Sequence, residues 1–293
     1  MTKENAWLFD FEAIGSKWNI KVYDNLYEQE WIDLSNDIYR ICLEFEHNYS
    51  RFIEDSFIGK LNKNKVLTDF PQELYNIFTY CQDLKDITKG SFDICRYGSN
   101  HLSIAKLDIL YNNCNISFIS KNKIEIEENT NIDLDGIGKG WLIDKMKYYL
   151  ETKNIKYFQI NGSGDLYVSS QIDQKFHILL ENPFLDNESI GYIELENESL
   201  SCSSHHTRTW EDQKTGEVYH HLINALTGKP ISAIRAVFTK GKNAKSTDYA
   251  STMIFVSSLD LKDSIAEFMD IEYLIIFETG QYIKSSNFKG IIN

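Results

Sequence analysis

The chain has 293 residues, of which 42% are hydrophobic and 25% are charged. These are ordinary values for a globular protein, and they exclude a collagen, a coiled coil or a chain that is disordered throughout. The 30 Lys and Arg residues are outnumbered by 43 Asp and Glu residues, which gives a formal net charge of −13. Because this charge repels a phosphate backbone, general binding to nucleic acid is not expected.

Membrane insertion and export are not predicted either. No stretch approaches the ~20 consecutive apolar residues that a membrane-spanning helix needs. The segment 1–7 lacks the basic and apolar regions of a secretory signal peptide. The five cysteines are widely spaced and form no Cys-x-x-Cys pair. They indicate a reduced, cytoplasmic setting.

Predicted helices and strands follow one another along the chain. Residues 17–23 alternate polar and apolar side chains and predict a strand, and residues 26–47 repeat apolar residues at helical spacing. A second helix is expected to open at Pro71 and to stop at Gly90, and a third to run from the glycine-rich segment 136–140 to about residue 151. Further strands are expected at 156–160, 166–170, 176–181, 190–195, 235–239, 272–277 and 281–284, and further helices at 246–258 and 261–270.

Consecutive strands, without a helix after each one, favour an α+β fold with mixed or antiparallel sheets flanked by helices. The chain shows no internal repeat and no low-complexity linker. We therefore expect a single domain over residues 1–293, with room for two intertwined α/β lobes that have no clean boundary.

The segment 132–140 combines acidic residues, three glycines and Lys139 between a predicted strand and a predicted helix. Glycines let the backbone approach a ligand, and a helix N-terminus offers unpaired N–H groups. With the Lys139 cation, the segment is interpreted as a cradle for a phosphate or pyrophosphate. It is neither a Walker loop nor a GxGxxG fingerprint, so a plain glycine-rich helix start is the alternative.

The segment 246–252 opens a predicted apolar helix. Asp248 and Thr252 are four residues apart and would face the same way. Their carboxylate and hydroxyl oxygens suit Mg²⁺. The alternative is ordinary helix capping, with Ser246 or Thr247 as the N-cap and Asp248 in the first turn.

Four histidines lie at positions 205, 206, 220 and 221, but no cysteine or third histidine completes zinc-ligand spacing around them. His221 is interpreted either as a general base or as a histidine at the edge of a strand. The shorter runs 50–56, 88–93 and 161–165 are interpreted individually as turns or helix caps.

Taken in order, these segments resemble the ApbE family of FAD:protein FMN transferases over almost the whole chain. The matching segments are 11–16, 50–62, 90–93, 133–140, 161–165, 220–228 and 247–252. The resemblance implies an ApbE-like fold and an Mg²⁺-dependent enzyme. Such an enzyme cleaves the pyrophosphate of FAD, attaches FMN through a phosphoester to a Thr or Ser of an acceptor protein, and releases AMP.

The resemblance also implies roles for individual residues. Catalysis would involve His221, Lys139 and Asp248. The FAD contacts would be Ile14, Phe52, Asn62, Ser91, Phe92, Asp93, Asp133, Lys139 and Ile223. The metal ligands would be a carbonyl in the glycine run, at Gly136 with Gly138 as the alternative, together with Asp248, Ser251 and Thr252.

Four positions depart from the family pattern. Asn224-Ala225 stands where the family has Asp-Pro, Asp135 replaces a glycine in the cradle, and Ser163 replaces another glycine. The first three of these changes leave open an alternative function, that of an FAD-binding protein or an FAD pyrophosphatase without transfer activity.

Overall fold

An antiparallel sheet of eight strands is the centre of the fold. The computed structural model describes residues 6–97, 116–170, 174–205, 209–211 and 218–292. In order across the sheet, the strands are β1 (Trp7–Ala13), β2 (Ser16–Val22), β8 (Phe158–Asn161), β9 (Asp165–Ser169), β12 (Glu198–Ser204), β17 (Ile234–Gly241), β18 (Ile271–Phe277) and β19 (Tyr282–Lys284). Each strand runs antiparallel to its neighbours.

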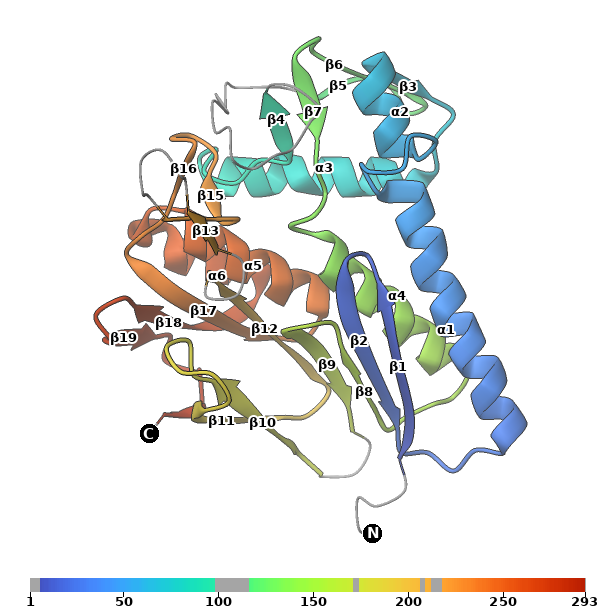
Figure 1. Cartoon of the computed structure of the whole chain (residues 1–293), viewed down its shortest axis with the longest axis vertical. Coiled ribbons are helices and arrows are strands. Elements are labelled where there is room, and N and C mark those ends of the chain that lie inside the picture. Colours follow the sequence, from blue (N-terminus) through green and yellow to red (C-terminus); the bar gives the residue numbers. More distant parts are fainter. Residues whose placement is uncertain (1–5, 98–115, 171–173, 206–208, 212–217, 293) are drawn as a thin grey trace.

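Helices cover one face of this sheet. The helices of the described residues are α1 (Glu28–Tyr49), α2 (Phe57–Asn64), α3 (Gln72–Ile87), α4 (Gly138–Thr152), α5 (Ala244–Val256), α6 (Lys262–Met269) and the short 3₁₀ helix η1 (Leu259–Leu261). Those that contact the large sheet most are α1, α4, α5 and α6. Figure 1 shows α4 and α5 packed behind the sheet and α1 alongside α4. The long helix α1 packs because Leu34, Ile38, Cys42 and Phe45 form one buried stripe at helical spacing.

Smaller sheets surround the large one. A three-stranded sheet consists of β10 (Phe176–Glu181), β11 (Ser189–Leu195) and β20 (Ile291–Ile292), and a second consists of β3 (Val66–Thr68), β6 (Lys123–Ile126) and β5 (Ile116–Ser120). Two-stranded pairs join β4 (Cys95–Tyr97) to β7 (Thr130–Ile132), β13 (Thr209–Glu211) to β14 (Val218–His220), and β15 (Ile223–Asn224) to β16 (Lys229–Pro230).

The large sheet has a hydrophobic core on each face. Successive residues of a strand point to opposite faces, and in β17 Val237 belongs to the core under the helices while Phe238 belongs to a second core. Phe176 and Leu180 of β10 complete this second core with Phe288. The α4 and α5 helices therefore lie on one defined side of the sheet, which is where the site is built.

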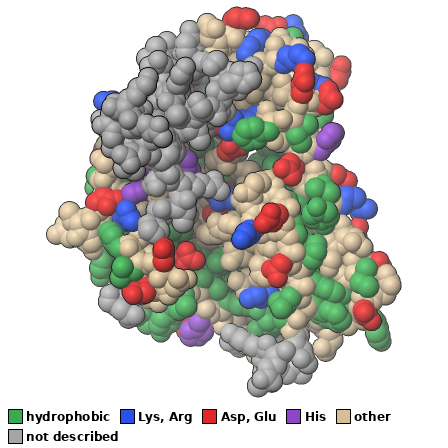
Figure 2. Space-filling model, in the orientation of Figure 1, with side chains coloured by type: hydrophobic (Ala, Val, Ile, Leu, Met, Phe, Trp, Pro, Cys, Tyr) green, Lys and Arg blue, Asp and Glu red, His purple; other side chains and the backbone are tan. Residues whose placement is uncertain are grey.

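The predicted α+β class with antiparallel sheets and flanking helices is confirmed. Every predicted helix and strand is present, although α3 begins one residue after Pro71, which is its N-cap. The ranges predicted from the sequence do not include the helix α2 or the strands β1, β3, β4, β5, β6, β7, β12, β13, β14, β15, β16 and β20. Among the described residues, no helix is both long and apolar enough to cross a bilayer. Acidic and basic side chains are interspersed over the face seen in Figure 2.

Candidate functional site

A cavity of about 460 Å³ opens beside the glycine-rich loop that precedes α4. Three parts of the chain form its walls: the β1–β2 turn, the end of α1 with the loop that follows, and the loop into α4. The lining residues are Ile14, Gly15, Ser16, Phe45, Glu46, Tyr49, Ser50, Phe52, Leu134, Asp135, Gly138 and Lys139. The predicted ligand contacts Ile14, Phe52 and Lys139 are thus brought together from positions far apart in the sequence.

Ile14 reaches this cavity from a strained turn. It has a φ of 45° and the next residue, Gly15, has a φ of 66°. Two consecutive positive φ angles suit the two-residue turn of a β-hairpin, where Asn or Gly is the usual first residue. A β-branched residue is rarely found in this conformation, and such outliers concentrate at functional sites. The strain at Ile14 therefore supports a ligand role for this turn.

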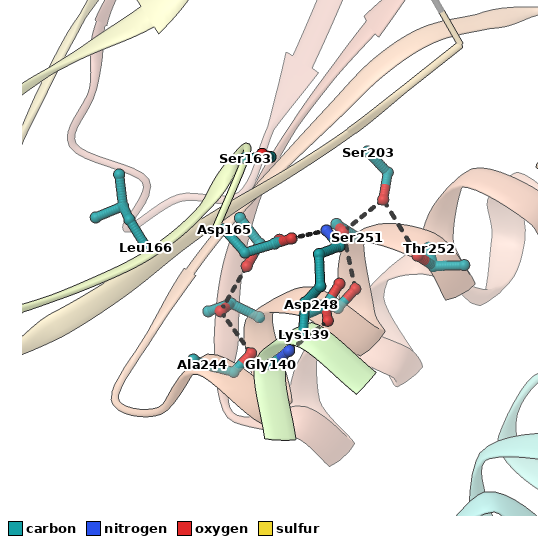
Figure 3. A network of polar contacts seen from close by, with 12 residues as sticks. Lys139, Gly140, Ser163, Asp165, Leu166, Ser203, Ala244, Asp248, Ser251 and Thr252 are labelled. Carbon is teal, nitrogen blue, oxygen red and sulfur yellow. Dashed lines mark hydrogen bonds and ion pairs between the residues drawn. The ribbon is translucent and has the colours of Figure 1, made fainter. Parts of the chain in front are cut away.

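Lys139, in the first turn of α4, forms an ion pair with the carboxylate of Asp165 at the start of β9. Asp165 is almost completely buried, and 22% of the Lys139 side chain is exposed. The ammonium group compensates a carboxylate that has lost its water, and Lys139 also lines the cavity. Figure 3 shows both residues where α4, α5 and the sheet meet.

The same turn of α4 contacts α5 directly. The backbone N–H of Gly140 donates a 2.7 Å hydrogen bond to the carboxylate of Asp248. Asp248 is only 4% exposed. Burial raises the pKa of this carboxyl group, while the Lys139 cation and the Gly140 N–H act in the opposite direction. The two segments on which the sequence prediction depended, 133–140 and 248–252, are therefore in direct contact.

The predicted start of α5 is wrong. The helix begins at Ala244, and its N-cap is Asn243, whose side chain accepts a hydrogen bond from Ser246 N–H. The carboxylate of Asp144 in α4 stabilises the same end of α5. It accepts hydrogen bonds from the N–H groups of Ala244 and Lys245. Asp248 therefore lies in the second turn and does not cap the helix. Its carboxylate faces α4, so the capping explanation for this residue does not hold.

Hydroxyl groups continue the site along α5. Ser203 of β12 lies 2.7 Å from the hydroxyl of Ser251 and 3.2 Å from that of Thr252. Ser251 also donates to the Asp248 carbonyl. Figure 3 shows this network of oxygen atoms beside Asp248. Carboxylate and hydroxyl oxygens are hard donors of the kind that Mg²⁺ takes in proteins, so the residues present fit that ion.

The expected cradle of helix-end amides is present only in part. The N–H of Gly138 donates to the carbonyl of Leu134, and the N–H of Gly140 is bound to Asp248. These two amides therefore serve the fold, and the Lys139 side chain is the main cationic group of the cradle. Gly136 lies beside Phe92. A Cβ added at this glycine would be 3.8 Å from the phenylalanine ring.

Other predicted FAD contacts support the loops around the site. Asn62 is buried and exchanges two hydrogen bonds with the backbone of Ile132, at 2.9 and 2.6 Å, so it holds the strand before the cradle. Ser91 and Phe92 are buried, and Asp93 forms a 2.8 Å ion pair with Lys85. The carbonyl of Ser91 accepts a hydrogen bond from Ala225 N–H, which joins this turn to the segment after His221.

The histidine segment lies near the far end of α5. His221 is exposed and follows β14, while His206 lies outside the described residues. His220 is buried, with ring nitrogens at 2.9 Å from the Ile231 carbonyl and 3.2 Å from Leu222 N–H. Burial lowers the pKa of His220. The described residues contain no group of three or more His, Cys, Asp or Glu side chains suited to a metal ion.

Ile223 is half-buried in β15, and Asn224 ties this segment to α5. The Asn224 amide donates a 2.8 Å hydrogen bond to the carbonyl of Val256, at the end of that helix. Its side-chain oxygen accepts from the N–H groups of Leu226 and Thr227. The residue that departs from the family pattern thus has a donor role that an ionised aspartate could not fill.

Three further residues contact the candidate site but were not singled out from the sequence. Asp165 lies in a segment interpreted only as a turn, and Arg51 lies in another such segment. Ser203 ends the alternating series Ser199, Ser201, Ser203, whose period of two was the available signal for a strand with one polar face.

Comparison with known proteins places the fold in a family. The model of the ApbE family matches residues 14–275. A relative from Vibrio cholerae named FAD:protein FMN transferase is 23% identical over 305 aligned positions, which cover 96% of this chain and 91% of the relative. A protein of the same name from Klebsiella pneumoniae is 25% identical over 126 residues, covering 42% of this chain and 38% of its own.

Solved structures agree with the expected ApbE-like fold. The ApbE protein of Thermotoga maritima superposes with a TM-score of 0.81 at 21% identity, covering 97% of this chain and 98% of its own. The flavin transferase ApbE of Vibrio cholerae gives a TM-score of 0.74 at 19% identity, with the same coverage. Because the family model matches most of its length, the chain belongs to the ApbE family.

Proposed function

We propose that this protein is an Mg²⁺-dependent FAD:protein FMN transferase, which attaches FMN to a Thr or Ser hydroxyl of an acceptor protein. The observation that carries the proposal is the 2.7 Å contact between Gly140 and Asp248. It joins a cationic loop beside a cavity of about 460 Å³ to a carboxylate and hydroxyls suited to a metal. The relatives named FAD:protein FMN transferase support the same activity.

Each group of residues has a distinct task in this proposal. Ile14 and Phe52 line the cavity and would contact the dinucleotide. Lys139 would neutralise charge on the diphosphate, because phosphoryl-type transfer depends mainly on charge stabilisation and placement. Asp248, Ser251 and Thr252, with a carbonyl in the glycine run, would hold Mg²⁺. When bound, the ion would polarise the diphosphate oxygens.

The proposed reaction exchanges one bond to phosphorus for another. The acceptor hydroxyl oxygen attacks the phosphorus on the FMN side of the diphosphate. The bond from that phosphorus to the bridging oxygen breaks, and AMP leaves with that oxygen. The hydroxyl proton passes to His221 as general base, which is the role implied for this residue by the family motif. No oxidation or reduction takes place.

The test is to incubate the protein with FAD, Mg²⁺ and acceptor peptides that carry either Thr or Ala at the modified position. We expect FMN to be added to the Thr peptide alone and AMP to be released in equal amount, as measured by mass spectrometry and chromatography. Asp248→Asn should abolish both products, whereas Asp260→Asn in the exposed η1 helix should change neither.

Two other outcomes would replace the proposal. If FAD binds but remains intact with Mg²⁺ and acceptor, the protein is an FAD-binding protein. If AMP and free FMN accumulate without an adduct on any acceptor encoded by the same genome, it is an FAD pyrophosphatase.

A further inference from the structure

Arg51 joins two loops at the mouth of the cavity. Its Nη2 donates a 2.9 Å hydrogen bond to Oδ2 of Asp135, across 84 positions of sequence. Its Nε lies 3.1 Å from Oδ1 of Asp133, without hydrogen-bond geometry. The Arg51 side chain is only 11% exposed although it lies at an opening. Of these two contacts of Arg51, the one with Asp135 is the one with hydrogen-bond geometry.

The Arg51 guanidinium covers one face of the Phe52 ring. Its central carbon lies 4.1 Å from the ring centroid, a distance at which a cation is attracted to the π system. Phe52 is nevertheless 72% exposed, and it lines the cavity. An accessible aromatic ring whose orientation is fixed from one side is suited to stack against a flat ring of a ligand.

Carboxylates surround the Arg51 cation at this part of the cavity. Arg51 lies between two carboxylates, so the cluster carries a formal charge of −1, and Glu46 also lines the cavity. Two of the guanidinium nitrogens already face carboxylates, so much of the positive charge of Arg51 is compensated before any phosphate approaches. The excess negative charge disfavours a phosphate beside Arg51, and the proposed function assigns the diphosphate to Lys139, which also lines the cavity. A dinucleotide would accordingly direct a ring toward Phe52 and its diphosphate toward Lys139.

We infer that Asp135 is a positioning residue for the ligand ring: it holds Arg51, which in turn holds Phe52 as a stacking surface. The inference rests on the proposed function in taking FAD as the ligand. The ApbE motif has a glycine where this chain has Asp135, so the motif itself does not supply this carboxylate. The contact between Asp135 and Arg51 acts on ligand binding and leaves the transfer step itself unchanged.

The test compares variants by flavin fluorescence titration and by steady-state kinetics. Asp135→Gly and Arg51→Lys should each raise the Kd for FAD and the KM by about tenfold, with kcat at saturating FAD unchanged within about twofold. Arg51→Lys keeps the charge but loses the planar group. Asp135→Glu should restore most of the affinity. The matched control is Glu54→Gln, which breaks the exposed Glu54–Lys63 pair in the same loop and should change neither quantity.

Titration with FMN and with AMP identifies which ring of FAD, flavin or adenine, stacks on Phe52. Only the compound that carries this ring should bind more weakly to Asp135→Gly than to the wild type. Thermal melting verifies folding, and Asp135→Ala replaces the glycine variant if that variant does not fold. Wild-type affinity in Asp135→Gly or Asp135→Ala, or a fall in kcat with unchanged KM, would overturn the inference and leave the proposed function intact. A wild-type protein that does not bind FAD would instead overturn the proposed function.

Discussion

The N–H of Gly140 and the carboxylate of Asp248 lie 2.7 Å apart, and this contact fixes the distance between α4 and α5 at the site. A side chain at position 140 has no room. A Cβ there would be 2.6 Å from the Ala244 carbonyl oxygen and 2.7 Å from Cβ of Asp248. The glycine is needed for close packing of the two helices, since its neighbours are backbone and Cβ atoms that cannot rotate away.

Gly140→Ala should therefore destabilise the protein by about 1–3 kcal/mol, which is typical of overpacking. It should also reduce transfer activity, because α5 has to move away from Lys139. Urea unfolding and the mass assay measure the two effects. Gly138→Ala is the matched control, since its Cβ would meet only Phe45 at an ordinary 3.5 Å. Equal stability of the two variants would show that the helices are not in close contact.

Asp248→Asn should be more stable than the wild type at neutral pH, by about 1 kcal/mol, although we expect it to be inactive. Burial raises the pKa of Asp248 from its ordinary value of 3.8, so the folded protein holds this proton more tightly than the unfolded chain. Ionisation then lowers stability as pH rises through the interval between the ordinary and the raised pKa. Asparagine removes this loss and still accepts from Gly140 N–H.

Unfolding free energies at several pH values, with and without Mg²⁺, test this expectation. The stability difference between Asp248→Asn and the wild type should shrink at acidic pH. Added Mg²⁺ should raise the melting temperature of the wild type alone. A variant that is less stable at every pH, or that gains as much from Mg²⁺ as the wild type does, would be incompatible with the proposed role of this carboxylate.

Lys139→Met should destabilise the protein by about 3 kcal/mol, because it leaves the buried Asp165 carboxylate without its cation. The double variant Lys139→Met/Asp165→Asn should recover most of that stability, since both charges are then gone. Neither variant should bind FAD with wild-type affinity. Lys60→Met, at an exposed position of α2, is the control. Additive effects in a double-mutant cycle of urea unfolding would argue against the ion pair.

Asn224→Asp restores the family residue but should destabilise the protein by about 1–2 kcal/mol at neutral pH. The Val256 carbonyl would lose its donor and face a carboxylate, which favours the protonated acid. The folded-state pKa of the new acid should therefore be raised, and the loss of stability should diminish as pH falls through that pKa. Denaturation of the variant and of the wild type at pH 5 and at pH 8 compares the protonated form of the new acid with its ionised form. A variant that matches the wild type at pH 8 would show that this hydrogen bond contributes little.

Several features of the fold could be predicted from local sequence. The α1 helix follows from apolar residues at helical spacing, and α4 begins inside the expected glycine run. The strand β12 escaped prediction because four of its seven residues are serines, which lack the β-branched and aromatic side chains typical of strands. It is stable in the centre of the sheet because Ser199 and Ser201 find hydroxyl partners on Thr247.

The sequence by itself determined which groups are available for chemistry: Lys139 in a glycine-rich loop, Asp248 with neighbouring hydroxyls, and the motif order of the ApbE family. Tertiary structure decided what each group does. Asp248 faces α4 because α5 begins earlier than its capping residues suggested, Asp165 balances Lys139, and Asp135 reaches Arg51 across 84 positions. Local patterns encode elements through short-range periodicity, whereas these contacts join segments that only the packed helices and sheet bring together.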